Sequence, residues 1–164
     1  MVADGPSTPR GDTVFWGLSM EWHFRSDDAN DALSKRRPFA EFLRARCTPE
    51  SDWQAAEIVY GELVANVVKH APGPIEIMLR SDSRGTVTIE VFDTATRFRI
   101  ARAVEPPLYS ESGRGLHITW QLCGNLSRTK TPNGGKVSVV LPVILLPSPD
   151  ADRGPISRAV PKLL

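Results

Sequence analysis

Hydrophobic and polar side chains alternate near the beginning of the chain. Apolar residues occupy every second position from Val14 to Phe24, and most of the positions between them are small or polar. A period of two is typical of a β-strand with one apolar face. We therefore expect the folded region to begin with a strand over this segment.

Two helices are predicted after this strand. The first covers residues 28–46, and Pro38 is expected to kink or divide it, because a proline inside a helix removes a backbone hydrogen bond. The second starts at Thr48, with Pro49 at the first helical position, and continues to about His70. The prolines and the glycine that follow His70 are expected to end this helix.

The second half of the chain alternates again, in two pairs of segments. Each pair flanks a short turn that contains glycine, so each pair predicts an antiparallel hairpin. Between the pairs, residues 94–112 contain few core-forming positions and predict a long surface loop. The predicted elements of this half are strands at residues 75–81, 86–93, 125–131 and 136–141 and a helix at residues 116–123.

The order of these elements predicts an α+β fold. We expect a two-layer sandwich in which the helices pack on one face of a mixed, mostly antiparallel sheet. A chain of 164 residues has the length of one domain. Six of its fourteen prolines lie near the two ends. We therefore expect flexible tails at residues 1–12 and 147–164 and a folded domain at residues 13–146.

Charge, apolar runs and cysteine content exclude several kinds of partner and of binding site. Twenty lysines and arginines against nineteen aspartates and glutamates give a formal net charge of +1, so no bulk field attracts nucleic acid or an anionic membrane. No apolar run reaches the roughly 20 residues that span a bilayer. The two cysteines form neither a disulfide framework nor a four-ligand zinc site. We expect a cytoplasmic protein that binds neither nucleic acid nor membrane.

Three polar residues recur at every fourth position in the second predicted helix. Glu62, Asn66 and His70 form a stripe beside the apolar residues that should face the sheet. A carboxylate and a carboxamide one turn apart suit magnesium and phosphate chemistry, because both offer hard oxygen atoms. The competing interpretation is a solvated helix face whose polar residues have no function.

Two further features support a phosphate site. Asp93 ends an apolar strand directly before the long loop, and Gly113 and Gly115 stand at the start of the following helix. Each feature alone is commonly a turn or loop signal. Backbone N–H groups at a helix start nevertheless provide a cradle for phosphate. Together with the polar stripe, these residues predict a nucleotide pocket.

These motifs resemble those of a known superfamily. The segments Glu62–Ala71, Asp93 and Glu111–Leu116 resemble the asparagine box and the two glycine boxes of the GHKL ATPases, which include gyrase, histidine kinases and MutL. The short chain and the closing segment Gly135–Pro142 are most similar to the small bacterial branch, the anti-sigma-factor serine/threonine kinases. The resemblance covers roughly residues 13–142 and implies the histidine-kinase-like ATPase fold.

The resemblance implies a role for each matching residue. Glu62 matches the general base that activates an incoming hydroxyl, and Asn66 matches the residue that helps to hold Mg²⁺. Asp93 matches the aspartate that accepts a hydrogen bond from the adenine amino group. ATP and Mg²⁺ are therefore the expected cofactors.

The two glycine boxes match the family's pattern only in part. Gly113 and Gly115 match lid glycines near the phosphates, and Arg114 between them adds positive charge there or is simply an exposed loop arginine. After Asp93, the family's first glycine is replaced by Ala95. A Cβ at that position would narrow the pocket or shift the loop.

Two functions follow as expectations. By resemblance, the protein transfers the ATP γ-phosphate to a serine or threonine of a protein antagonist and also binds a sigma factor, as a possible homodimer. The alternative, which Ala95 favours, is a catalytically silent protein-interaction module that binds nucleotide weakly or not at all.

Overall fold

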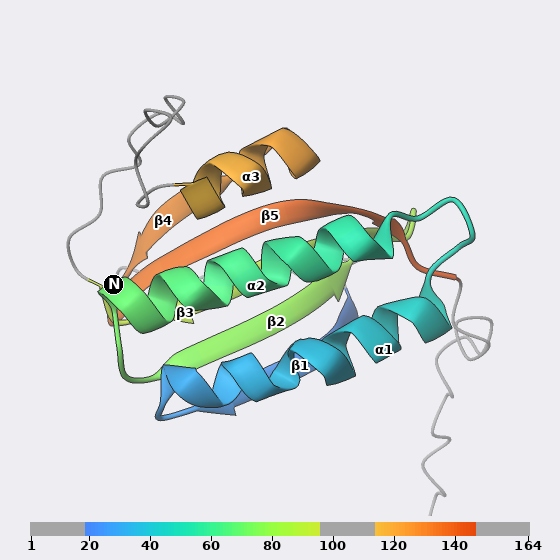
Figure 1. Ribbon diagram of the computed structural model, residues 1–164. Helices are drawn as coiled ribbons and strands as arrows, with labels where there is room; N and C mark the ends of the chain where they lie inside the picture. The colour runs from blue at the N-terminus through green and yellow to red at the C-terminus, as the bar shows by residue number, and fades with distance from the viewer. Residues whose placement is uncertain (1–18, 96–113, 147–164) are drawn as a thin grey trace, which may run out of the picture.

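The computed structural model describes residues 19–95 and 114–146, and these residues form one five-stranded sheet covered by helices (Figure 1). Every strand pairing described is antiparallel, so the sheet is antiparallel throughout rather than mixed. Across the sheet, the strands lie in the order β1 (Ser19–Ser26), β2 (Ile75–Ser81), β3 (Thr86–Asp93), β5 (Gly134–Ile144) and β4 (Ser127–Thr131). The predicted α+β class is confirmed.

The described helices lie on one face of the sheet, which confirms the predicted two-layer sandwich. Figure 1 shows α2 running along the middle of that face, with α1 and α3 on either side of it. The helical elements are a 3-10 helix, η1 (Ala29–Lys35), followed by α1 (Arg36–Arg46), α2 (Trp53–His70) and α3 (Arg114–Cys123).

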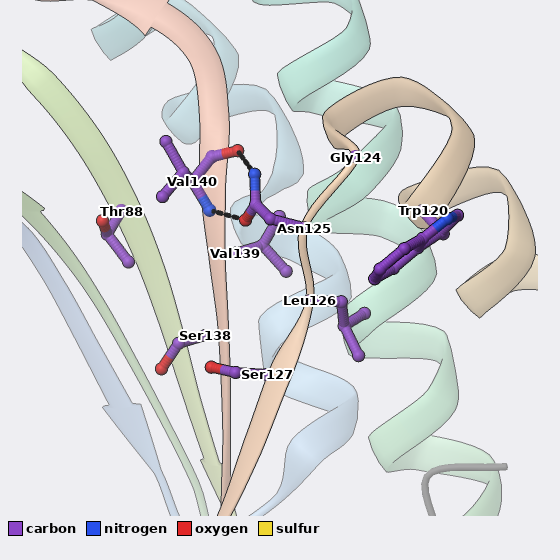
Figure 2. Close-up of a pocket in the computed structure, with 9 residues that line it drawn as sticks. All are labelled: Thr88, Trp120, Gly124, Asn125, Leu126, Ser127, Ser138, Val139 and Val140. Atoms are coloured by element: carbon purple, nitrogen blue, oxygen red, sulfur yellow. Dashed lines mark hydrogen bonds between the residues drawn. The ribbon is translucent and has the colours of Figure 1, made fainter. Parts of the chain in front are cut away.

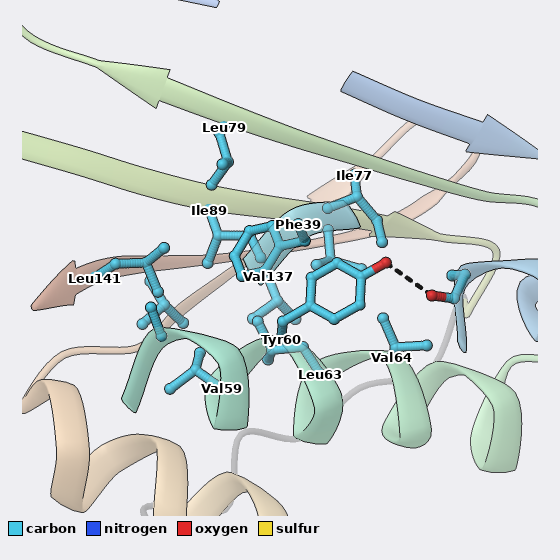
Figure 3. Packing of buried hydrophobic residues seen from close by; sticks show 14 of the residues in the cluster. Phe39, Val59, Tyr60, Leu63, Val64, Ile77, Leu79, Ile89, Val137 and Leu141 are labelled. Atoms are coloured by element: carbon cyan, nitrogen blue, oxygen red, sulfur yellow. Dashed lines mark hydrogen bonds between the residues drawn. The ribbon is translucent and has the colours of Figure 1, made fainter. Parts of the chain in front are cut away.

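The core fills the space between α2 and the sheet (Figure 3). Burial alternates along β2 and β3, as their sequence pattern predicted. Ile77, Val91 and Val137 are paired across β2, β3 and β5, and all three side chains are buried. Alternation therefore places one apolar row from each of these three strands under the helices.

The first predicted helix is divided, but not by its proline. A 3-10 helix capped by the Asp28 side chain, which accepts from the Asn30 N–H at 2.9 Å, runs directly into α1. Pro38 lies in the first turn of α1. A proline is tolerated there, because N–H groups of the first turn have no partner within the helix.

The second predicted helix starts later than Thr48. Asp52 caps α2 by accepting from the Ala55 N–H at 2.9 Å. The segment before it covers the edge of β5, where the Thr48 N–H donates to the Ile144 carbonyl and the Asp52 N–H to the Pro142 carbonyl, both at 2.9 Å. These hydrogen bonds to a distant strand replace the expected first helical turn.

Several other boundaries differ from the predictions. β1 continues to Ser26, and the part of the predicted first strand before Ser19 lies outside the described residues, as do both predicted tails and most of the long loop. α3 begins at Arg114, and β5 extends to Ile144. None of the described helices is both long and apolar enough to cross a bilayer.

Candidate functional site

The polar stripe predicted on the second helix lies at the edge of the core. Val59, Leu63 and Val67 of α2 are buried, whereas Glu62 and Asn66, on the neighbouring stripe, are half-buried. The helix therefore packs one side against the sheet and presents its polar side along the border between core and solvent.

A pocket of about 210 Å³ opens along this stripe. It lies between the second half of α2 and the first turn of α3, so the predicted residues Glu62, Asn66 and Gly115 meet in one place. Its lining residues are Glu62, Ala65, Asn66, Lys69, His70, Gly115 and Leu116.

Lys69 is a pocket residue that sequence reasoning missed. It follows Asn66 by three positions on α2, and residues at this spacing are neighbours on a helix surface. That spacing was the available signal. The lysine gives the pocket a positive charge beside the Glu62 carboxylate and the Asn66 carboxamide.

Gly115 permits the close packing of Glu62 against α3. A Cβ added at Gly115 would overlap Oε2 of Glu62 and would lie 3.3 Å from its Cδ. The Glu62 carboxylate is therefore packed against the first turn of α3, where backbone N–H groups favour negative charge. This contact requires glycine because of the approach of a side chain, not because of an unusual backbone angle.

The outcome is different for Arg114 and Gly113, the other two residues predicted near the phosphates. Arg114 is exposed at the start of α3 and does not line this pocket. Gly113 lies outside the described residues, so its predicted role at the phosphates stays a prediction.

Asp93 is the last residue of β3, where the strand was predicted to end, and its side chain is buried. It lines a separate pocket of about 530 Å³ at the strand ends, together with residues such as Thr94 and Asn133. Within the described residues, Asp93 and Glu62 therefore do not share a pocket. The two residues are linked through the order of the elements. Asp93 ends β3, and the next described element along the chain is α3, which lies beside Glu62; residues 96–113 between them are not described.

Ala95 fits the observed backbone without a glycine. Its N–H donates to Oδ1 of Asp93 at 2.9 Å, and its side chain packs against the core. Among the described residues, positive φ angles occur only at glycines, so Ala95 adopts an ordinary conformation. The departure from the family's glycine is therefore compatible with the position of Asp93.

A second missed residue is Arg128 on β4. Its Nη2 donates to Oδ1 of Asp93 at 2.9 Å, and the two side chains are only 4% and 2% exposed. The available signal was alternation, since Leu126 and Arg128 occupy every second position and so point to the same face of the sheet. The partner of the arginine was not predictable from that pattern.

The chemistry of the first pocket fits Mg²⁺ that is bound together with a nucleotide. No group of three or more His, Cys, Asp or Glu side chains suited to a metal occurs in the described residues. Mg²⁺ in phosphate-transfer sites is commonly held by one or two protein oxygens together with substrate phosphates. Asn66 supplies such an oxygen, and Lys69 supplies a charge for phosphate.

Another pocket, of about 320 Å³, lies where the end of α3 leads into the start of β4 (Figure 2). Asn125 borders it and forms two hydrogen bonds with the backbone of Val140, accepting from N–H at 2.7 Å and donating to the carbonyl at 3.3 Å. The half-exposed Trp120 forms one wall. Its lining residues are all uncharged, so this pocket lacks groups that would bind phosphate.

Comparison with known proteins agrees with this geometry. The profile of the histidine kinase-like ATPase domain family matches residues 26–141, which is most of the chain and nearly all of the described fold. No curated protein matches the chain. The chain therefore belongs to the histidine kinase-like ATPase domain family.

Proposed function

We propose that this protein binds ATP with Mg²⁺ and transfers the γ-phosphate to a hydroxyl group of a protein. The observation that carries the proposal is the pocket between α2 and α3, where Glu62 lies against the first turn of α3 and Asn66 and Lys69 follow on the same side of α2. Membership of the histidine kinase-like ATPase domain family supports the choice of nucleotide.

Each side chain in the pocket has a distinct chemical task. Glu62 would accept the proton of the attacking hydroxyl, Asn66 would help to hold Mg²⁺ through its carboxamide oxygen, and Lys69 would compensate the charge of the phosphates. When bound, Mg²⁺ neutralises charge on the phosphates. Positioning and charge compensation supply most of the rate in phosphoryl transfer.

Replacing Glu62 separates catalysis from binding. Glu62→Gln should lower the rate of phosphate release from MgATP by about 10²–10⁴-fold, the usual contribution of a general base, with MgATP affinity within about threefold of wild type. Phosphate release to water serves as the assay, and calorimetry measures affinity. Asn66→Ala should instead weaken MgATP binding.

Glu57→Gln is a matched control for Glu62→Gln. Glu57 lies on the same helix but pairs with Arg36 and Arg44, outside the pocket. We expect its phosphate release to stay within about twofold of wild type, since partly exposed ion pairs contribute little. Equal activity of wild type and Glu62→Gln would disprove the assigned role of Glu62.

We further propose that the acceptor is a serine or threonine of an anti-sigma-factor antagonist and that the protein binds a sigma factor. This proposal rests on the resemblance of the closing segment Gly135–Pro142 to that of the small bacterial kinases. Incubation of the protein with γ-labelled MgATP and fractionated host extract should yield labelled phosphoserine or phosphothreonine. Label recovered only as phosphohistidine would contradict the proposed acceptor.

A catalytically silent protein-interaction module is the second candidate. The observation that favours it is the departure from the family's first glycine box, because Ala95 stands where the family has glycine. Calorimetry distinguishes the two candidates, because a lack of heat change at millimolar MgATP would leave only the silent module.

A further inference from the structure

Arg128 reaches Asp93 across an intervening strand. Arg128 is on β4, which pairs with β5, and β5 in turn pairs with β3, where Asp93 is the last residue. The guanidinium group therefore crosses β5 to donate to Oδ1 of Asp93 at 2.9 Å. With side chains 4% and 2% exposed, the pair is buried rather than a surface contact.

Two glycines at the start of β5 allow the close approach of the Arg128 side chain and of the backbone at the end of β3. A Cβ on Gly135 would overlap Nη2 of Arg128 and would lie 2.8 Å from its Cζ. A Cβ on Gly134 would overlap the carbonyl oxygen of Asp93 and would lie 2.7 Å from the Cα of Thr94. Glycine weakens a strand, so its presence at both positions marks a close approach that larger residues would prevent.

The pair fixes one oxygen of the carboxylate and leaves the other available. The Arg128 guanidinium and the Ala95 N–H both donate to Oδ1 of Asp93 at 2.9 Å. Among the described residues, no hydrogen bond reaches Oδ2. A buried carboxylate is tolerated when its charge is compensated, and a planar guanidinium also fixes its orientation.

We propose that Arg128 is a positioning residue that sets the base specificity of this protein. By holding Oδ1 of Asp93, it orients Oδ2 to accept a hydrogen bond from the amino group of a 6-aminopurine nucleotide. This inference rests on the nucleotide binding proposed above. It adds that recognition of the amino group depends on an arginine that acts through Asp93.

The test compares ATP with purine riboside triphosphate, which lacks the 6-amino group, in the full chain with Mg²⁺ by calorimetry. Wild type should bind ATP at least about tenfold more tightly, because a hydrogen bond to a charged group contributes a factor of this order or more. Arg128→Met should reduce this preference to less than about threefold. A loss of stability alone would weaken both nucleotides equally, so the ratio reports positioning.

Arg128→Lys covers the case in which Arg128→Met does not fold. Lysine keeps the compensating charge but lacks the planar fork that orients a carboxylate, so the preference for ATP should again fall. Arg80→Met is the matched control: Arg80 forms an ion pair with Glu90 at 3.0 Å on the same sheet, away from Asp93, and its loss should leave the preference unchanged.

The outcomes separate the two proposals. If wild type prefers ATP and every folded Arg128 variant keeps that preference, the role of Arg128 is disproved while nucleotide binding stands. If wild type binds neither nucleotide, the proposed function fails, and the role of Arg128 fails with it. If wild type binds both nucleotides equally, Asp93 does not read the amino group, and the inference is overturned although nucleotide binding stands.

Discussion

Burial determines the chemistry of the two cysteines. Desolvation raises the pKa of Cys123 to about 11, and the Asp52 carboxylate contributes in the same direction. Desolvation also raises the pKa of Cys47, against smaller opposing effects from a hydrogen bond with Ser51 and the charge of Arg46. The thiolate is the reactive form of cysteine, so both residues act as small apolar side chains.

This shift predicts slow thiol chemistry in the folded protein. At about pH 8, Cys123 should react with a disulfide reagent at least about tenfold more slowly than glutathione, because a raised pKa reduces the thiolate fraction. Cys47 should also react more slowly than glutathione, for the same reason. The reaction rate of Cys123 should still be rising at about pH 10. The absorbance of the thiolate released from the reagent measures the reaction rate. The denatured protein, which should react at the ordinary rate, is the control. A fast reaction of the native protein at neutral pH would contradict the expectation.

Two helical glycines, Gly61 and Gly115, show how the surroundings of a residue determine the effect of adding a side chain. Gly61 on α2 and Gly115 on α3 are both helical, and helix propensity alone would favour alanine at each. Their surroundings differ. A Cβ at Gly61 would lie 3.6 Å from the nearest atom, a flexible arginine side chain, whereas a Cβ at Gly115 would overlap the Glu62 carboxylate.

The two alanine variants should therefore behave in opposite ways. Gly61→Ala should stabilise the protein by about 0.5–1 kcal/mol without loss of activity, because it adds helix propensity in available space. Gly115→Ala should displace Glu62, lower phosphate release by at least about tenfold and give no gain in stability. Urea unfolding and the phosphate assay measure both effects. A stabilised and fully active Gly115→Ala would show that the contact with Glu62 has no catalytic importance.

At the scale of the whole molecule, Tyr60 joins the helical layer to the sheet (Figure 3). Its ring stacks on Phe39 of α1, with centroids 4.5 Å apart, and lies edge-on to Trp22 of β1. Its hydroxyl donates to the Ala32 carbonyl of η1 at 2.8 Å, and burial raises its pKa. Trp22 therefore packs against the core, and the predicted homodimer stays a prediction.

Removing the Tyr60 hydroxyl should weaken the whole fold. Tyr60→Phe keeps the ring packing but leaves the buried Ala32 carbonyl without its donor, which should lower the free energy of unfolding by about 1–3 kcal/mol. Urea unfolding measures this change, and a single transition with unchanged slope is expected. Ser34→Ala, which removes an exposed hydrogen bond to the Asp31 carbonyl, is the control and should change stability by less than about 0.5 kcal/mol. A Tyr60→Phe variant as stable as wild type would contradict the role of this hydrogen bond.

Local pattern was enough for the parts of the fold that depend on near neighbours. The strands at residues 75–81 and 86–93 lie where alternation placed them, because the same period of two decides which side chains are buried. The spacing of Glu62 and Asn66 likewise placed both in one pocket, since residues four apart share a helix face. The start of α2 could not be predicted, because residues 48–52 form hydrogen bonds with β5 rather than with the helix.

The α+β class, most of the elements and the polar stripe of α2 follow from the order of residues alone, because periodicity and helix-ending residues act over a few positions. Three features depend on the packed fold: β5 lies between β3 and β4, Arg128 contacts Asp93, and Glu62 packs against Gly115. These contacts join residues that are far apart in the chain. Their partners depend on strand order and on the space left between packed layers, and neither is encoded in any local pattern.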